Sequence, residues 1–285
     1  MLGNAGPSRG SAPMGKHGRQ GCWNVQAFLS FLLLCSPPET QPPVRQMKPA
    51  EPTLSLPWPG ARPLPDTFFD RDAQLVAREL LGKVIRHRVG AQWLSARIIE
   101  TEAYYLVDKG SHASLGYTDK RKALFADGGH IYMYYARGGD SLNFSAQGPG
   151  NAVLIKSAHP WLDAISGADA LAAMQRNNPG SQSQPRTPER LCAGQTLLCK
   201  ALGLKVPDWD ACRFDLQRLF VEDVGERPHS IIQCARLGIP KGRDEHLPYR
   251  FVDARYARHC TRNPLRRGQV EGHDYQLHTL EPTRP

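Results

Sequence analysis

The fold is best worked out from residues 97–104, which run Arg97-Ile98-Ile99-Glu100-Thr101-Glu102-Ala103-Tyr104. The stretch 93–104 has the character of a β-strand, and successive side chains of a strand point to opposite faces. The spacing therefore predicts two sets of side chains: Glu100, Glu102 and Tyr104 on one face, and Ile99, Thr101 and Ala103 on the other. The two carboxylates would lie roughly 7 Å apart on the same face.

A pair of carboxylates on one strand has two interpretations. The first is the solvated face of an antiparallel sheet, whose other face covers the core. The second is an acid/base site, in which burial or a like charge raises the pKa of one carboxyl towards neutrality. The strand taken by itself leaves both interpretations open.

The surrounding sequence predicts alternating helices and strands. Asp72 is placed to cap a helix that stops at Gly82, and residues 83–89 alternate as a strand joined to 93–104 by a turn at 90–91. A glycine-rich stretch follows from Gly128 to Gly150. The remaining expected elements are an aromatic strand at 131–135, a strand at 152–155, helices at 162–176 and 191–202, a loop at 177–190, and no regular structure after Arg267.

The first 65 residues differ from the rest because they are rich in Gly, Pro and Ser. Their one apolar run, 27–35, is far shorter than the roughly 20 residues of a membrane-spanning helix. An export signal is not expected, since no small-x-small site follows the run and Leu34 stands where a lipoprotein signal needs a small residue. The alternative interpretation is a leader that the working protein lacks, with translation starting at Met14 or Met47. The predicted organisation is a disordered leader at 1–65, a folded domain at 66–267 and a flexible tail at 268–285.

The composition favours a polyanionic partner and argues against a disulfide framework. The 285 residues carry a formal charge of +9 and a pI near 9.3. Residues 1–46 hold +3 of that charge, which leaves +6 for the part expected to fold. The seven cysteines show no repeated spacing, which fits reduced thiols in a cytosolic setting. Cys192 and Cys199 are expected to pack helices, because no second pair completes a metal-binding spacing.

Two further segments carry side chains suited to chemistry. Residues 108–114 form a polar loop around His112, a residue type that on its own is more often structural than catalytic. Tyr132, Tyr134 and Tyr135 lie within four residues and close to Arg137. Aromatic rings beside basic side chains are what stacking on unpaired bases requires, although a core aromatic strand is the equal alternative.

Taken in order and spacing, these segments resemble the alkyladenine (3-methyladenine) DNA glycosylase family over roughly residues 66 to 255. The E-T-E-A-Y box at 100–104 is the most specific piece. The other matching segments are weak singly and strong as an ordered set: 68–70, 77–82, 108–112, 129–134, 142–145, 147–148, 191–194, 198–203, 236–239 and 248–251.

The resemblance implies a mixed α/β (α+β) fold, a single domain with a curved, mainly antiparallel sheet flanked by helices and a projecting β-hairpin. It also implies a DNA repair enzyme that flips out alkylated or deaminated purines and hydrolyses the N-glycosidic bond, leaving an abasic site. Such an enzyme is monofunctional and needs no metal and no other cofactor. The expected partner is double-stranded DNA with damaged purines, not a membrane. The expected state is a monomer in the bacterial cytoplasm at the nucleoid, or in the nucleus of a eukaryote.

The resemblance also assigns roles by position. Glu102 matches the general base that activates the attacking water, and its charge stabilises an oxocarbenium-like transition state. Tyr104 and Tyr134 match the aromatic walls that sandwich the flipped base. His112 matches a residue that hydrogen-bonds at the base and sugar, and Asn143 one that rejects purines with an unwanted exocyclic amino group.

The sequence departs from the family near the aromatic strand. Arg137 stands where mammalian members have a tyrosine wedge, and one residue fewer separates this point from Asn143. Either Arg137 fills the gap left by the flipped base, or another group does, or flipping is weaker. Lys156 stands where the family has a basic residue and is expected near the site or the DNA backbone, while Gln195 replaces a usual proline.

Two other functions are weighed against the enzyme. A catalytically silent module on the same fold would bind damaged DNA with a steep salt dependence and release no base. An exported carbohydrate hydrolase would use Glu100 and Glu102 as its two carboxylates, but neighbouring positions on one strand rarely flank a sugar from both sides. The intact Glu102 favours the glycosylase.

Overall fold

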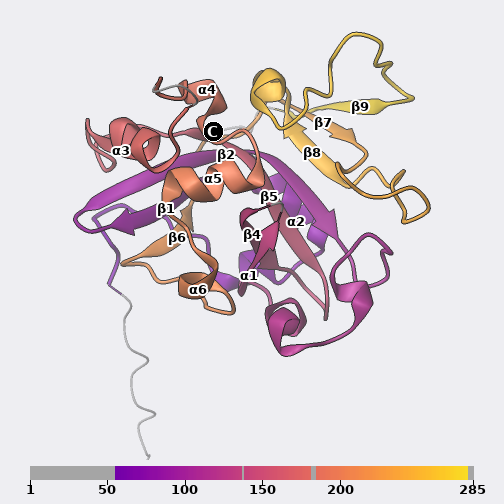
Figure 1. Cartoon of the computed structure of the whole chain (residues 1–285), viewed down its shortest axis with the longest axis horizontal. Coiled ribbons are helices and arrows are strands. Elements are labelled where there is room, and N and C mark those ends of the chain that lie inside the picture. The colour runs from indigo at the N-terminus through magenta and orange to yellow at the C-terminus, as the bar shows by residue number, and fades with distance from the viewer. Residues whose placement is uncertain (1–54, 137, 181–183, 282–285) are drawn as a thin grey trace, which may run out of the picture. The chain divides into compact units, whose positions relative to one another are not determined.

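An antiparallel sheet of nine strands, not closed into a barrel, is the frame of the protein (Figure 1). The computed structural model describes residues 55–136, 138–180 and 184–281. The strands follow the order β3-β4-β5-β2-β8-β7-β9, with β1 on β2 and β6 on β1. The strands are β1 Val84–Val89, β2 Gln92–Tyr104, β3 Ile131–Ala136, β4 Gly139–Ser145, β5 Ala152–Pro160, β6 Leu219–Glu222, β7 Ser230–Cys234, β8 Arg250–Asp253 and β9 Tyr275–Thr279.

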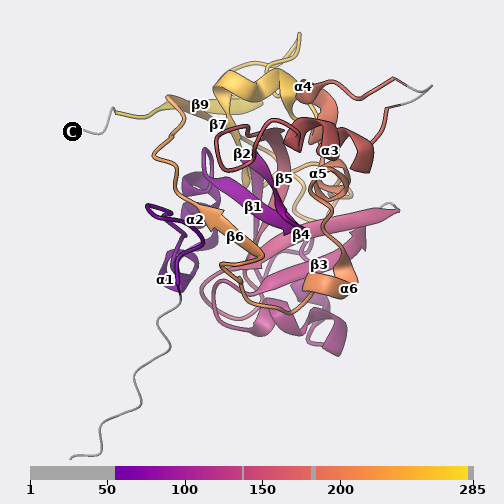
Figure 2. The ribbon, with the colours of Figure 1, turned by 90° about the vertical axis from the view of Figure 1, so that its left-hand side faces the viewer.

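Helices cover both sides of this sheet. Figure 2 shows α1 and α2 on one side and α3, α4 and α5 on the other. The α-helices are α1 Asp66–Phe69, α2 Ala73–Glu79, α3 Ala170–Asn177, α4 Pro188–Leu191, α5 Gln195–Leu202 and α6 Val206–Trp209, and the 3-10 helices are η1 Ala113–Leu115, η2 Asp119–Phe125 and η3 Ala254–His259. The mixed α/β class and the mainly antiparallel sheet predicted from the sequence are confirmed.

The long strand β2 is the centre of the sheet. Along one edge it pairs with β5, and along the other it pairs first with β1 and then with β8. The sheet therefore divides at β2 into an arm of β1 and β6 and an arm of β8, β7 and β9. The E-T-E box lies where β2 is paired on both edges, so its backbone is held at every residue from Glu100 to Glu102.

Two bulges interrupt the pairing of β2 with β5 beside Glu100. Ile99 on β2 and Lys156 on β5 have no partner in the register, so each strand carries one extra residue. A bulge shifts the alternation of side chains by one position. Ile99 consequently packs in a small cluster with η3 and β8 while Ala103 lies in the main core, and the face predicted for Ile99 was wrong.

Both carboxylates of the E-T-E box are fully buried, so the interpretation as a solvated sheet face was wrong. Segments from the C-terminal part of the chain cover them. The backbone N–H of Leu237 contacts Glu102, and that of Thr261 contacts Glu100. A local strand pattern does not show which distant loops fold over it.

The start of the folded region follows the local signals. Asp72 caps α2, because its Oδ1 accepts from the backbone N–H groups of Gln74 and Leu75 at 3.0 and 3.1 Å. Gly82 ends this segment with φ +88, and a side chain there would lie 2.7 Å from the carbonyl oxygen of Glu226. On β2, Thr101 Oγ1 donates to the carbonyl of Ala77, which ties α2 to β2.

Two predicted helices are shorter than expected. The stretch 162–169 is not helical, because Asp163 accepts from the backbone N–H groups of Ile165 and Ser166 in a tight turn and pairs with Arg86 at 2.7 Å. The predicted helix 191–202 is interrupted at Gly194, whose φ of +135 no helix accommodates. It is instead the end of α4 followed by α5.

The last strand was not expected, and the prediction of no regular structure after residue 267 was wrong there. β9 pairs with β7 through its backbone from Ser230↔Thr279 to Cys234↔Tyr275. Edge pairing of this kind depends on backbone groups and leaves no alternation of apolar residues in the sequence.

The cysteines of the described residues are all free, and Cys22 and Cys35 lie outside those residues.

The predicted projecting hairpin is formed by β3 and β4 (Figure 2). Its register closes at Ala136↔Gly139, so the connection has two residues, and Gly138 has φ +80. Phe144 on β4 anchors the hairpin in the main core by edge contacts with Phe69 and Phe214 at 5.5 and 5.1 Å. The opposite face of the hairpin carries Tyr132, Tyr134 and Asn143 towards the site described next.

Candidate active site

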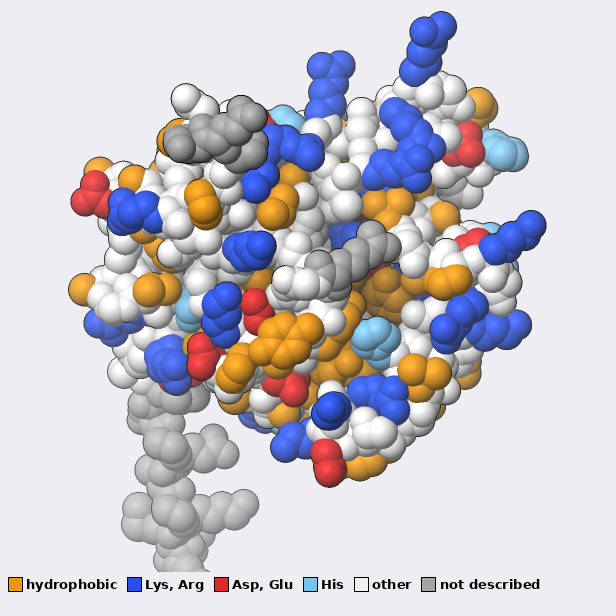
Figure 3. Space-filling model, in the orientation of Figure 1, with side chains coloured by type: hydrophobic (Ala, Val, Ile, Leu, Met, Phe, Trp, Pro, Cys, Tyr) orange, Lys and Arg blue, Asp and Glu red, His pale blue; other side chains and the backbone are white. Residues whose placement is uncertain are grey.

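A cavity of about 700 Å³ opens beside the hairpin. The face drawn in Figure 3 is hollowed near its middle, where apolar side chains lie below surrounding Lys and Arg side chains. The hairpin, the loop before η1, the N-terminal end of α5 and the segment after β7 meet there, together with residues of η1, η2, β2 and β5 and with Thr261. The residues used below that line it are Tyr104, His112, Tyr132, Tyr134, Asn143, Lys156, Gly194, Leu237, Arg243 and Thr261.

Glu102 lies behind this lining, and three donors hold its carboxylate. Oε2 accepts from the Tyr104 hydroxyl at 2.7 Å and from Lys156 Nζ at 3.3 Å. Oε1 accepts from the backbone N–H of Leu237 at 2.9 Å. Glu102 is fully buried, whereas all three of its partners line the cavity. The carboxylate is therefore linked to the cavity through its three hydrogen-bond donors.

The electrostatic environment of Glu102 favours its charged form. Burial alone would raise its pKa, but the Lys156 ammonium, the Leu237 N–H and the Tyr104 hydroxyl outweigh burial, and the pKa of Glu102 is lowered. The pKa of Tyr104 is raised well above its ordinary value by burial and by the neighbouring carboxylate. At neutral pH the site thus holds an ionised Glu102 and a protonated Tyr104.

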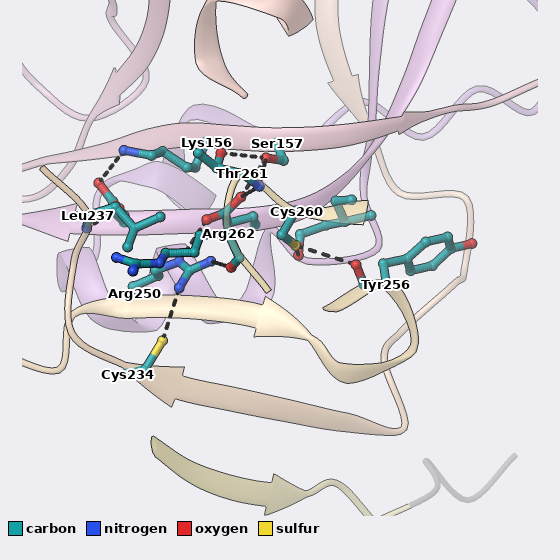
Figure 4. Close-up of polar contacts among 12 residues, drawn as sticks. Lys156, Ser157, Cys234, Leu237, Arg250, Tyr256, Cys260, Thr261 and Arg262 are labelled. Carbon is teal, nitrogen blue, oxygen red and sulfur yellow. Dashed lines mark hydrogen bonds and ion pairs between the residues drawn. The ribbon is translucent and has the colours of Figure 1, made fainter. Parts of the chain in front are cut away.

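The bulge on β5 explains how Lys156 reaches Glu102. Lys156 is the unpaired residue of that bulge, while the next pair along the strands joins Thr101 to Ile155. Bulges are common beside active sites, where they change the direction of a side chain. Figure 4 shows Lys156 pointing along the strand to a carboxylate beside Leu237. Lys156 therefore lies at this cavity, and the role expected for it stays a prediction.

Three aromatic groups form one wall of the cavity. The rings of Tyr132 and Tyr134 stack with 5.5 Å between centroids and 25° between planes. His112 meets Tyr134 edge-on at 4.4 Å, and its Nδ1 lies 3.1 Å from the Tyr132 hydroxyl. Burial, with Arg121 and Arg243 adding to it, lowers the pKa of His112 below its ordinary value, so the imidazole is neutral at pH 7.

Asn143 and Tyr104 complete the inner part of the cavity. The Asn143 side chain is buried, and its Nδ2 donates to the carbonyl of Tyr132 at 3.0 Å, which fixes the orientation of the amide. The Arg236 guanidinium lies 4.5 Å from the centre of the Tyr104 ring and pairs with Asp108 at 2.8 Å. Tyr104 is thus held by a cation at its ring and by a carboxylate at its hydroxyl.

The comparison with known proteins covers most of the described residues. The family model for Methylpurine-DNA glycosylase matches residues 67–257. A protein from Pseudomonas aeruginosa (strain LESB58) is 81% identical over 227 residues, which are 80% of this chain and 95% of that protein. The chain belongs to the methylpurine-DNA glycosylase family. A relative from Pseudomonas savastanoi pv. phaseolicola (strain 1448A / Race 6) is 78% identical over 74% of this chain and 95% of its own length.

The family extends to a distant relative. A protein from Methanocella arvoryzae (strain DSM 22066 / NBRC 105507 / MRE50) is 33% identical over 195 residues, 67% of this chain and 92% of its own length. All three relatives bear the name "Putative 3-methyladenine DNA glycosylase". The resemblance stated from the E-T-E-A-Y box is thereby confirmed.

Most of the residues expected at a glycosylase site are brought together. Tyr104, His112, Tyr134, Asn143 and Lys156 line one cavity, and Glu102 contacts two of them. Their roles stay predictions. Arg137, the residue expected to act as a wedge or to bind DNA, lies outside the described residues.

Sequence reasoning missed three partners of this glycosylase site. The backbone N–H of Leu237 donates to Glu102, which lies 135 residues away in the chain. Any residue type except proline can supply such a donor, so the sequence gives no signal for it. Arg236 behind Tyr104 belongs to a segment that matched the family, but its charge had no stated role. Tyr132 was noted only as one member of an aromatic run, although its hydroxyl contacts His112.

Glu100, the second carboxylate, does not share the surroundings of Glu102. Its oxygens accept from Arg250 Nε at 2.7 Å, from Ser157 Oγ and from the backbone N–H of Thr261 at 3.0 Å. Every donor of Glu100 thus differs from those of Glu102. In the described residues no group of three or more His, Cys, Asp or Glu side chains is arranged to hold a metal ion, and no helix among them could span a bilayer.

Proposed function

We propose that this protein is a monofunctional DNA glycosylase that excises alkylated or deaminated purines with a water activated by Glu102. Membership of the family supports a hydrolase acting on N-glycosyl bonds in DNA. The observation that carries the finer proposal is the ionised carboxylate of Glu102, held by three donors directly behind an aromatic cavity. An enzyme that reaches a glycosidic bond inside a duplex must first flip the nucleotide out of the stack.

The cavity supplies the contacts that an extruded purine needs. Tyr134 offers an aromatic face, and stacking of one base on such a ring contributes about 1–3 kcal/mol. An electron-rich tyrosine also attracts a cationic alkylated purine, by about 0.5–2 kcal/mol. Nδ2 of Asn143 donates one hydrogen to the Tyr132 carbonyl and keeps a second. An exocyclic amino group of a purine that faced this Nδ2 would set a donor against a donor.

The chemical step follows from the hydrogen bonds of Glu102. An ionised carboxylate has about four acceptor positions, and three are filled, two on Oε2 and one on Oε1. The remaining position on Oε1 accepts a proton of the attacking water. The water oxygen forms a bond to C1′ of the sugar, the bond from C1′ to the purine nitrogen breaks, and the purine keeps that electron pair. The proton lost by the water goes to Glu102.

The charge of Glu102 also acts before the proton moves. As the bond to the purine stretches, positive charge develops on the sugar, and a carboxylate fixed nearby stabilises it. A lowered pKa makes Glu102 a weak base but keeps it charged over a wide pH range. Electrostatic stabilisation by Glu102 therefore contributes the larger share of catalysis, and proton transfer contributes the smaller share.

The position of Lys156 supports hydrolysis by water over covalent catalysis by an amine. A lysine that attacks a sugar needs a free, deprotonated amine. Lys156 Nζ is instead in an ion pair with Glu102 at 3.3 Å. Its position supports a role in holding the carboxylate and keeping it ionised.

One copy of the chain supplies the whole site, and we propose a monomer that acts where the DNA lies, in the bacterial cytoplasm or the eukaryotic nucleus.

The experiment is base release from defined duplexes. Purified protein is incubated with duplexes that carry one hypoxanthine, one ethenoadenine or one 3-methyladenine, and abasic sites are then cleaved with alkali. A strand break at the lesion of at least one duplex is expected, with no break before alkali. Tight binding without any release would favour the catalytically silent module, and a break before alkali would show that the enzyme is not monofunctional.

A further inference from the structure

Glu100 is a buried charge that the proposed reaction does not use. Its carboxylate is fully buried and satisfied by three donors, two from side chains and one from the backbone of Thr261. Figure 4 shows Ser157, Arg250 and Thr261, the residues that make these contacts, on three separate parts of the chain. A charge buried at this cost, next to the most family-specific residues, calls for a role.

The partners of Glu100 all lead to one turn, residues 260–262. Arg250, which pairs with Glu100 through Nε, donates from Nη2 to the carbonyl oxygen of Arg262 at 2.6 Å. Thr261 donates its N–H to Glu100, and its Oγ1 lies 3.0 Å from Ser157 Oγ. Cys260 is buried against the bulged residue Ile99. Each of the three residues of the turn thus contacts Glu100 itself or a residue next to it: Thr261 contacts Glu100, Arg262 contacts Arg250, and Cys260 contacts Ile99.

This turn reaches the cavity although it lies beyond residue 257, where the family match ends. Thr261 lines the cavity, and its Oγ1 would lie 3.8 Å from a side chain placed on Gly194 at the N-terminal end of α5. Lys156, which pairs with Glu102, lines the same cavity as Thr261, and Ser157, the next residue of β5, hydrogen-bonds the Thr261 hydroxyl. The sugar of a flipped nucleotide must enter this cavity for water at Glu102 to reach C1′.

We propose that Glu100 is a positioning residue that fixes the turn 260–262, so that the Thr261 hydroxyl binds the sugar–phosphate backbone of the flipped nucleotide. The inference rests on the proposed glycosylase function. Ser157 Oγ donates to Glu100 and can then only accept from the Thr261 hydroxyl. The oxygens of a DNA sugar–phosphate backbone accept hydrogen bonds, so the Thr261 hydroxyl turns its hydrogen from Ser157 to a phosphate oxygen, while Ser157 Oγ still accepts from the Thr261 N–H at 3.2 Å.

The test is a double-mutant cycle of Glu100→Gln and Thr261→Val, read by single-turnover excision at increasing enzyme concentration. Each single variant is expected to raise the enzyme concentration for half-maximal rate about tenfold, with the saturated rate within about threefold of wild type. The double variant is expected to be no worse than the worse single variant, because Glu100 acts through Thr261. Glu102→Gln gives the opposite pattern, with a lost saturated rate and retained binding.

Glu222→Gln is the matched control. Glu222 is also buried and pairs with an arginine, Arg86, at 2.7 Å, but it lies on β6 and is not part of the cavity. Wild-type excision kinetics are expected for this variant even if its melting temperature falls. Hydrogen exchange adds a readout besides activity, since the amide hydrogen of Thr261 is expected to exchange faster in Glu100→Gln than in Glu222→Gln.

The outcomes separate the inference from the function on which it rests. Additive effects in the cycle, or unchanged half-saturation in Glu100→Gln, overturn the inference and leave an active glycosylase. Equal loss in Glu222→Gln and Glu100→Gln overturns it too, because a general loss of stability then explains both. A wild-type protein that releases no base from any of the duplexes overturns the proposed function and the inference together.

Discussion

Replacing Lys156 by methionine tests the electrostatics of the site in depth. The ammonium lies 3.3 Å from Glu102 Oε2. With an effective dielectric constant of about 20, two unit charges at that separation attract by about 5 kcal/mol. Removing the ammonium removes that attraction, so the pKa of Glu102 rises in the variant. Burial, the largest influence on this carboxyl, would then be opposed only by the remaining donors.

The expected result is a displaced pH dependence. In the wild type the pKa of Glu102 lies below its ordinary value, so excision is insensitive to this group above about pH 5. In Lys156→Met the pKa moves towards neutrality, and the single-turnover rate at pH 6 should be about tenfold or more below the rate at pH 8.5. The assay is release of hypoxanthine from a duplex under enzyme excess at pH 5 to 9.

The pH dependence of protein stability tests the same rise in the pKa of Glu102 by a second measurement. A carboxyl with a lowered pKa stabilises the fold above its unfolded pKa, and that contribution is lost as the pH falls through the folded value. A carboxyl with a raised pKa costs stability as the pH rises from its unfolded pKa. The melting temperature of Lys156→Met, relative to wild type, should therefore fall between about pH 5 and 8.

Lys205→Met is the control for this prediction. Lys205 also lies 3.4 Å from a carboxylate, Asp140, but its side chain is half exposed and contacts no residue of the proposed mechanism. Its pH profile should match the wild type. The reasoning is refuted if Lys156→Met keeps the wild-type acid limb, or if the control shifts as far.

Three further predictions concern the cavity and its support. Tyr134→Ala should raise the half-saturating enzyme concentration about 5- to 100-fold, because it loses base stacking of about 1–3 kcal/mol. Tyr134→Phe keeps the ring and should raise that concentration less than about threefold; single-turnover titration measures both. Asn143→Ala should increase the release of guanine relative to hypoxanthine about tenfold, measured on matched duplexes, and an unchanged ratio would exclude the proposed selective role. Phe144→Ala should lower the free energy of unfolding by about 3–5 kcal/mol in urea titrations, since it empties a buried contact with Phe69 and Phe214.

The strand at 97–104 could be predicted because its information is local. Alternation placed Glu100, Glu102 and Tyr104 on one face of the strand. In the structure Thr101 contacts Ala77 of α2, whereas Glu102 contacts Tyr104 and Glu100 contacts Arg250. The cap at Asp72 is likewise a matter of neighbours in sequence. The family resemblance extended this local reading to the whole sheet.

Burial of the carboxylates could not be predicted because it depends on distant segments. The N–H donors of Glu102 and Glu100 come from Leu237 and Thr261, more than 130 residues away in the chain. The bulge at Lys156 is another long-range property, since it exists only in the register of β5 against β2. Neither the distant N–H donors nor the bulge can be predicted from the sequence of β2 alone.

The shortened helices have a different origin. Residues 162–169 have helical spacing, but the side chain of Asp163 binds local N–H groups and the buried Arg86, and these bonds outweigh a weak helix propensity. At Gly194 the backbone turns away from helix and places the start of α5 beside Thr261. Both departures serve tertiary contacts that the spacing of apolar residues does not encode.

The most direct measurement is the comparison of wild type with Glu102→Gln on a duplex with one hypoxanthine, reading binding and base release side by side. Glutamine keeps the size of the side chain and an acceptor for the Leu237 N–H, but it removes the charge. The account predicts that release falls by about a thousandfold or more while the dissociation constant stays within about threefold. Release at the wild-type rate, or an equal loss of binding and release, would contradict a catalytic role for Glu102.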